Sequence, residues 1–268
     1  MTDSRSLRSR DRKEQPIMEG VSLEALISRP TTDVESLRTA ASHASLTEDL
    51  ALLLLERRDL PSVILDDLSK NGHAMKQRKV KVALVQHPRT PRHVSLPLLR
   101  RLYTFELMNV ALTAGIAADV KILAEEALTA RFGTISAGEK LTLAKRSSAR
   151  VSAALLNDPD NRVVEAALNN PFLTEIWVSR AILRSEPSPI LALQVCRHAK
   201  WSVRQVVREA LLRCECTPLA QAIIISQTFK LPALQEILHH SDLPPNVKEY
   251  LLEAAKKRKP SSPARGKN

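Results

Sequence analysis

Apolar residues recur along the chain at the spacing expected of helices that are buried on one side. After Val120 they occupy positions i+3, i+4, i+7 and i+8, and a similar pattern follows Val203 and Val247. A stripe of this kind is typical of an amphipathic α-helix. The pattern predicts helices that begin near these valines, with the valines themselves buried.

The leading valine of this pattern recurs at a nearly constant interval. Successive copies are 46, 40, 43, 40 and 44 residues apart, at Val34, Val80, Val120, Val163, Val203 and Val247. A fixed period indicates one helical unit copied along the chain, because such units pack on their neighbours instead of sharing one core.

A second series consists of Ser and Thr residues that follow each valine by about a dozen positions. Its members are Thr47, Thr90, Ser136, Thr174 and Thr217. A hydroxyl at a helix N-terminus accepts a hydrogen bond from the first turn, so these positions predict N-caps. Proline after Thr90 and Thr217 suits the first helical position, and Glu139 gives Ser136 the spacing of a capping box.

A third series of helices is expected in the remaining space, after each capped helix and before the next periodic valine. Their predicted starts are near Pro61, Phe105, Ala149, Pro189 and Pro232. Each period would then contain three short helices, in an all-α fold. Pro97 falls inside the helix expected from Pro91, where it should kink or restart that helix because proline lacks an amide donor.

Short segments of the chain resemble the repeat signature of HEAT and armadillo proteins. The resemblance is carried by Asp158 to Ala167, Ala118 to Lys121 and Trp201 to Arg204, while the turns Asn169 to Pro171 and His87 to Pro88 resemble the leucine-rich repeat variant. It covers about residues 30–256 and concerns an architecture, not one protein. It implies a right-handed α-solenoid of about five to six three-helix repeats. Only one unit carries the full Asp-Pro form.

The composition fits close-packed helices and sets the expected domain limits. Six glycines and 3% aromatic residues suit short helices better than sheets. We expect one α-solenoid domain over residues 19–256, between disordered basic tails at 1–18 and 257–268, because both ends lack apolar residues. No apolar run is long enough for a bilayer and no secretory signal is visible, while three cysteines favour a reducing compartment. These features predict a cytoplasmic protein.

The net charge of +11 is concentrated in the two ends and in one internal segment. The basic segment, residues 76–101, contains no acidic residue and eight basic ones: Lys76, Arg78, Lys79, Lys81, Arg89, Arg92, Arg100 and Arg101. One interpretation is an anion-binding surface for nucleic acid, acidic protein or membrane. The other is a solvated face that pairs with the acidic residues of 15–75.

A second group of cations, Arg197, Lys200, Arg204, Arg208 and Arg213, surrounds Trp201. Because an aromatic residue at a helix start commonly packs between repeat units, we interpret Trp201 as a packing residue. Cys196, Cys214 and Cys216 lack the paired spacing of zinc sites, so we expect thiols there and predict no metal. No phosphate-binding loop or other nucleotide motif occurs, so we predict no cofactor.

Three functions are compatible with these features. The leading hypothesis is a non-catalytic helical-repeat scaffold that binds a protein partner, acidic where it meets the basic segment. The alternative is a nonspecific nucleic-acid-binding protein that uses the basic segment and the C-terminal tail. A HEAT-like DNA glycosylase ranks below both, with Glu175 beside Trp177 as its nearest local match. Oligomeric state is not predicted.

Overall fold

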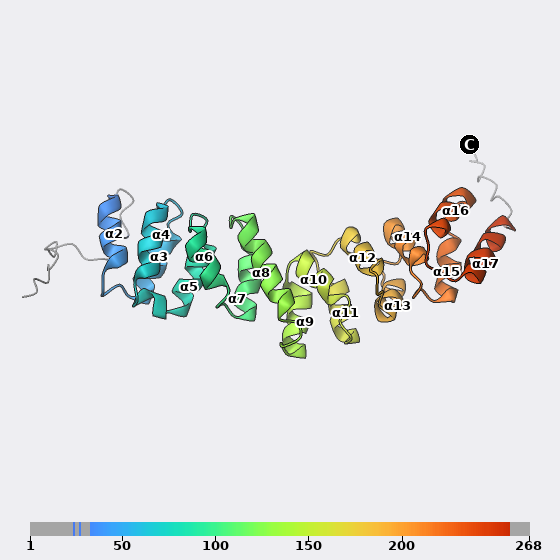
Figure 1. Cartoon of the computed structure of the whole chain (residues 1–268), viewed down its shortest axis with the longest axis horizontal. Helices are drawn as coiled ribbons and strands as arrows, with labels where there is room; N and C mark the ends of the chain where they lie inside the picture. Colours follow the sequence, from blue (N-terminus) through green and yellow to red (C-terminus); the bar gives the residue numbers. More distant parts are fainter. Residues whose placement is uncertain (1–23, 25–26, 28–32, 258–268) are drawn as a thin grey trace, which may run out of the picture. The chain divides into compact units, whose positions relative to one another are not determined.

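A computed structural model describes residues 24, 27 and 33–257 of the chain (Figure 1). Every regular element within these residues is helical, which confirms the all-α prediction. The tails predicted at 1–18 and 257–268 lie outside the described residues, except for Lys257. No helix in the described part of the chain is long and apolar enough to cross a membrane.

The helices divide into two compact units that meet between Val94 and Ser95. The single domain expected over residues 19–256 stays a prediction. Unit 1 contains α2 (Val34–Ser42), α3 (Glu48–Glu56), α4 (Ser62–Lys70), the 3-10 helix η1 (Ala74–Lys76) and α5 (Arg78–Gln86), and α6 (Arg92–Leu99) crosses the boundary.

Unit 2 contains the remaining described helices. They are α7 (Thr104–Leu112), α8 (Ala118–Ala130), α9 (Ala137–Arg146), α10 (Ala149–Leu155), α11 (Asn161–Leu168), α12 (Glu175–Ile182), α13 (Pro189–Arg197), α14 (Gln205–Arg213), α15 (Leu219–Ser226), α16 (Leu231–His239) and α17 (Pro245–Lys256).

Within each unit, packing recurs between helices that are two apart in the chain. In unit 1, α2 packs on α4 and α3 on α5. In unit 2, α9, α11 and α13 form one such series, and α10, α12, α14 and α16 form another. The three-helix repeat and its handedness stay predictions. Five of the periodic valines lie in every third α-helix, namely α2, α5, α8, α11 and α17, and Val203 lies just before α14.

Three of the six periodic valines are buried as predicted, and two are not. Val80, Val120 and Val163 are buried and Val247 is half-buried, whereas Val34 is 45% and Val203 60% exposed. The prediction was wrong at Val203 because α14 begins only at Gln205.

Trp201 occupies the buried place that was expected for Val203. The residue is 1% exposed, and its indole N–H donates to the Leu168 carbonyl at 2.8 Å. Its burial and its bond to the end of α11 confirm that Trp201 is a packing residue.

Three of the five predicted caps stand at helix N-termini. Thr47 and Ser136 accept a hydrogen bond from the first turn, and Ser136 forms the predicted capping box with Glu139. Thr174 precedes α12 but makes no side-chain cap bond.

The caps predicted at Thr90 and Thr217 were wrong. Their hydroxyls donate backward, to the carbonyls of Leu84 at 2.6 Å and Leu211 at 2.5 Å. Each residue is buried beside the end of the preceding helix, where carbonyls lack intrahelical partners. The hydroxyl therefore caps the C-terminus of that helix and does not cap the N-terminus of the next one.

The third predicted series matches the observed helix starts to within one residue. Those helices begin at Ser62, Thr104, Ala149, Pro189 and Leu231. The restart expected at Pro97 does not occur, because α6 continues through this proline to Leu99. Only the last turn depends on the bond that proline cannot make, which limits its cost.

Polar side chains after helix C-termini join helices that are two apart in the chain within each unit. Asn71, His87, Asn170 and Ser241 each accept a hydrogen bond from the amide two residues later. Each also donates to a backbone carbonyl 26 to 30 residues earlier, at distances of 2.7 to 2.9 Å. These bridges supply hydrogen bonds to carbonyls near helix ends, where intrahelical donors run out.

Candidate binding site

The basic segment is divided between the two units. Lys76 ends η1, and Arg78, Lys79 and Lys81 lie in the first turn of α5; Arg89 and Arg92 follow in the loop and in α6. Arg100 and Arg101 belong to unit 2. Six of the eight side chains are exposed, while Arg78 and Lys81 are half-buried. The structure thus brings six of the predicted residues into one compact unit.

Cationic side chains of this segment contact acidic and carbonyl groups within unit 1. Lys79 Nζ lies 3.3 Å from a carboxylate oxygen of Glu48. Arg89 donates to the Asp59 carbonyl at 2.7 Å. A hydrogen bond from Arg57 lowers the pKa of the Asp59 carboxyl, and the charge of Arg89 adds to this effect. His93, between the basic residues, lies 2.7 Å from Asp66. These contacts favour the interpretation of a face that pairs with acidic residues.

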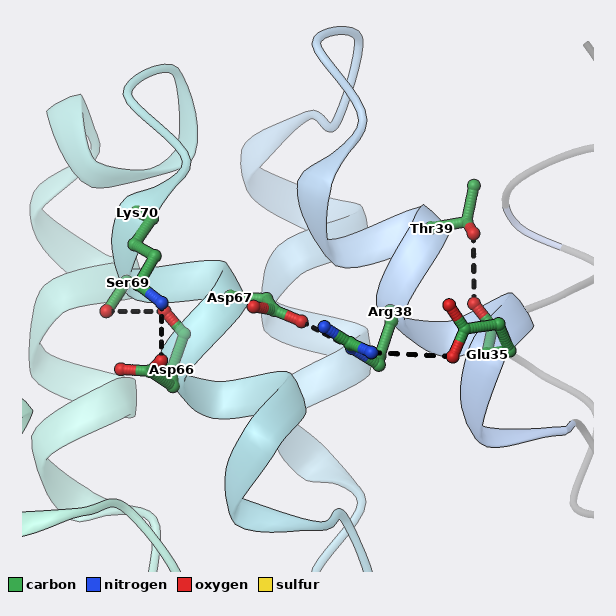
Figure 2. Close-up of polar contacts among 7 residues, drawn as sticks. All are labelled: Glu35, Arg38, Thr39, Asp66, Asp67, Ser69 and Lys70. Atoms are coloured by element: carbon green, nitrogen blue, oxygen red, sulfur yellow. Dashed lines mark hydrogen bonds and ion pairs between the residues drawn. The ribbon is translucent and has the colours of Figure 1, made fainter. Parts of the chain in front are cut away.

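The acidic residues of unit 1 are themselves held by cations, as Figure 2 shows for α2 and α4. Arg38 lies between Glu35 and Asp67, with its Nε 2.7 Å from Asp67, and Lys70 bonds Asp66 at 2.6 Å. Hydrogen bonds from Lys70 and His93 lower the pKa of the Asp66 carboxyl below its ordinary value. Positive and negative charges of this unit are therefore interleaved.

Cations around Trp201 are also engaged locally. Arg204 pairs with Glu175 at 3.3 Å, Arg208 donates to the Ser202 carbonyl at 2.7 Å, and the Lys200 ammonium lies 4.1 Å from the centre of the Trp201 ring. With the Trp201 ring buried, this cluster offers no free aromatic surface.

A different group of residues forms a pocket between α8, α10 and α12 of unit 2. The arginine pocket has a volume of about 250 Å³ and is lined by Thr129, Arg150, Ala153, Ala154, Asn157, Trp177, Arg180, Ala181 and Arg184. None of these residues was predicted from the sequence to be a binding residue. Trp177 was named only as the neighbour of Glu175 in the glycosylase hypothesis. Glu175 does not line the pocket.

The pocket is built from two stripes with the same spacing. Arg150, Ala153, Ala154 and Asn157 stand at i, i+3, i+4 and i+7, and Trp177, Arg180, Ala181 and Arg184 repeat this spacing on and just beyond α12. Residues at such intervals share one helix face. Helix α10 packs directly on α12, so the two faces lie opposite each other. The short alanine side chains leave space between the longer arginine and tryptophan side chains.

Charge in the pocket is only partly compensated. Arg150 lies 3.1 Å from Glu126 and 4.0 Å from Glu125. Arg180 and Arg184 are exposed, and neither forms an ion pair with any residue that the structure describes. Arg180 also lies over the indole of Trp177, 5.7 Å from its centre, which orients the guanidinium at the pocket wall.

The carboxamide of Asn157 has no hydrogen-bond partner among the described residues. Both its oxygen and its nitrogen are buried. A buried polar atom without a partner costs roughly 1–3 kcal/mol, so hydrogen bonds to this side chain from a ligand would be favourable. The same amide can accept one hydrogen bond and donate another to a group that enters the pocket.

The cysteines do not supply a reactive group at neutral pH. Cys196 lines a smaller pocket of about 170 Å³, and burial raises the pKa of its thiol to about 11. Burial also raises the pKa of Cys214 and Cys216. All three are free thiols, and the described residues contain no cluster of three or more His, Cys, Asp or Glu able to hold a metal.

Comparison of the chain with protein-family models, with curated proteins and with solved structures finds no match. The function proposed below therefore rests on the residues of this chain and on their arrangement.

Proposed function

We propose that this protein is a non-catalytic helical scaffold that binds a protein partner on unit 2. The observation that carries the proposal is the arginine pocket, where uncompensated guanidinium groups adjoin an aromatic ring and a buried amide. Arginine and aromatic residues are enriched in the cores of protein interfaces and supply most of their binding energy.

Exposed apolar side chains on α12 and α14 support a protein partner. Ile176, next to Trp177, is 60% exposed, and Val206 at the start of α14 is 47% exposed. The Glu175–Arg204 ion pair links the starts of α12 and α14. Apolar surface bordered by charged groups suits a protein contact better than a phosphate backbone.

The proposal also extends to architecture and location. We propose that the helices belong to a right-handed α-solenoid of the HEAT and armadillo class, and the packing of helices two apart supports such stacking. A cytoplasmic location is part of the same proposal, supported by the three free thiols.

The test is affinity capture with the full chain and with matched surface variants. Wild type should retain one protein in about a one-to-one ratio from an extract of its native cells, and Ile176→Asp with Val206→Asp should lose it. Leu219→Asp, at another exposed apolar position, should retain it. Circular dichroism should show all proteins folded. Equal capture by both variants, or recovery of nucleic acid alone, would contradict the proposal.

One observation favours nucleic acid as a second candidate. The first turn of α5 contains Arg78, Lys79 and Lys81 but no acidic residue, and its N-cap makes no side-chain bond. The N-terminus of a helix carries a partial positive charge, which the positive side chains of α5 repel. A bound phosphate would neutralise both the helix end and these side chains. The Glu48 and Asp59 contacts weigh against this candidate. Glu175, the acid named in the glycosylase hypothesis, does not line the arginine pocket and pairs with Arg204.

A further inference from the structure

The arginine pocket presents two separate chemical requirements to any ligand. Arg180 and Arg184 have no anionic partner among the described residues, whereas Arg150 is shared with Glu125 and Glu126. The anionic ligand group should therefore lie toward the α12 side of the pocket. Guanidinium groups bind carboxylates through paired, charge-assisted hydrogen bonds.

Asn157 sets the second requirement. Its buried carboxamide has one free acceptor and one free donor at the same place. One residue of an extended main chain offers its own N–H and C=O on the same side, which matches this donor and acceptor. An extended segment of polypeptide with an acidic side chain would meet both requirements from adjacent residues.

Nucleic acid fits this pocket less well. Trp177 is the one aromatic residue in the lining, and Arg180 already lies over its ring. Single-stranded nucleic acid is usually held by successive free aromatic rings on which bases stack. Ala153, Ala154 and Ala181 provide small apolar walls with no further stacking surface.

We propose that the arginine pocket binds an acidic peptide segment of the partner. Arg180 and Arg184 hold a glutamate or aspartate carboxylate, and the Asn157 carboxamide pairs with the main-chain N–H and C=O of the same segment. This inference rests on the proposed function, because it names the chemistry of the partner that the scaffold binds.

Intrinsic fluorescence of the full-length protein reports on the pocket directly. The chain has two tryptophans, of which Trp177 lines the pocket and Trp201 is buried elsewhere. Titration with a ten-residue glutamate peptide should change the emission, and Trp177→Phe should abolish that change. Binding to this variant is then followed through a dye on the peptide and should persist.

Two sets of variants separate pocket binding from general attraction. Arg180→Gln with Arg184→Gln should weaken peptide binding by about tenfold or more, because two charge-assisted contacts are lost. Arg162→Gln with Arg197→Gln removes the same charge from exposed positions outside the pocket and should change affinity by less than about twofold.

Asn157→Leu provides a test that loss of folding cannot mimic. Removing an unpartnered buried amide should leave the thermal midpoint unchanged or higher, yet weaken the peptide by about tenfold. Lower stability together with weaker binding would assign Asn157 a structural role and overturn its part in recognition.

The remaining outcomes decide between ligand classes. A ten-nucleotide oligothymidylate that changes Trp177 emission, where the glutamate peptide does not, would overturn the proposal in favour of nucleic acid. Equal peptide binding by the pocket and control variants would also overturn it. If capture of a protein still depends on Ile176 and Val206 in that case, the scaffold survives and only the acidic segment is rejected. If no protein is captured either, both proposals fail.

Discussion

The basic segment of unit 1 and the arginine pocket of unit 2 both gather cations, but their surroundings differ. In unit 1, Lys79 and Arg89 contact Glu48 and Asp59 on preceding elements. In unit 2, Arg180 and Arg184 share a wall with Trp177 and lack an anionic partner among the described residues. Lys79 of the basic segment thus has an anionic neighbour, whereas Arg180 and Arg184 of the arginine pocket have none among the described residues. Charge available for binding depends on neighbours in space more than on density along the chain.

The largest expected effect compares equivalent asparagines in the two units. Asn71→Ala and Asn170→Ala should each lower the free energy of unfolding by roughly 2–4 kcal/mol, because each leaves buried amide and carbonyl groups without partners. Chemical denaturation with circular dichroism measures the change. A loss in only one unit would show that the bridges are not equivalent.

A smaller loss is expected from truncating one buried periodic valine. Val163→Ala should cost about 1–3 kcal/mol through lost apolar contact and a residual cavity, since Val163 is fully buried. Val203→Ala, at an exposed position, should change stability by less than about 0.5 kcal/mol. Equal losses at both positions would contradict the burial of Trp201 in place of Val203.

The neutralisation of unit 1 can be tested by removing its acidic groups. Replacing Glu48, Asp59 and Asp66 by Gln, Asn and Asn should strengthen nonspecific binding of duplex DNA at ~50 mM salt. Each cation released to a phosphate should steepen the slope of log affinity against log salt by about 0.9. Fluorescence anisotropy across a salt series measures both quantities.

The control for that experiment removes three acidic residues of unit 2, namely Glu209, Glu249 and Glu253. This variant has the same net charge but leaves the basic segment paired, so its salt slope should change less. If both variants bind DNA equally, the contacts of Glu48 and Asp59 do not limit the basic segment.

The smallest effect concerns pH and again compares the two units. Burial lowers the pKa of His87 in unit 1 and of His198 in unit 2 below the ordinary value of about 6.5. The unfolded chain then binds protons more readily, so stability is full above about pH 6.5 and falls as pH drops toward the lower folded pKa.

Thermal midpoints should therefore decrease when they are measured at pH values from 7.5 down to 5.5. His87→Gln should reduce the decrease more than His198→Gln, because His87 is buried and His198 is half-buried. A midpoint that rises on acidification would contradict the direction of both shifts.

Helical class and many helix starts could be predicted from the sequence. Local signals define them: the apolar stripe after Val120, the capping box of Ser136 and Glu139, and the prolines near helix starts. Those signals act within one or two helical turns, so the helix starts that they define do not depend on tertiary contacts. A local signal cannot show which of two neighbouring helices a hydroxyl will bond. The caps predicted at Thr90 and Thr217 were therefore wrong, because these hydroxyls donate to carbonyls of the preceding helix.

The pairing of helices and the arginine pocket were decided by tertiary structure alone. A repeat of about 40 residues shows which helices are alike but not which ones touch, and the contacts recur between helices two apart. The stripes from Arg150 and from Trp177 are ordinary helix faces in sequence; they become a pocket because α10 packs on α12. Whether a cation is neutralised depends on distances of a few ångströms between residues some 30 positions apart, which no local pattern encodes.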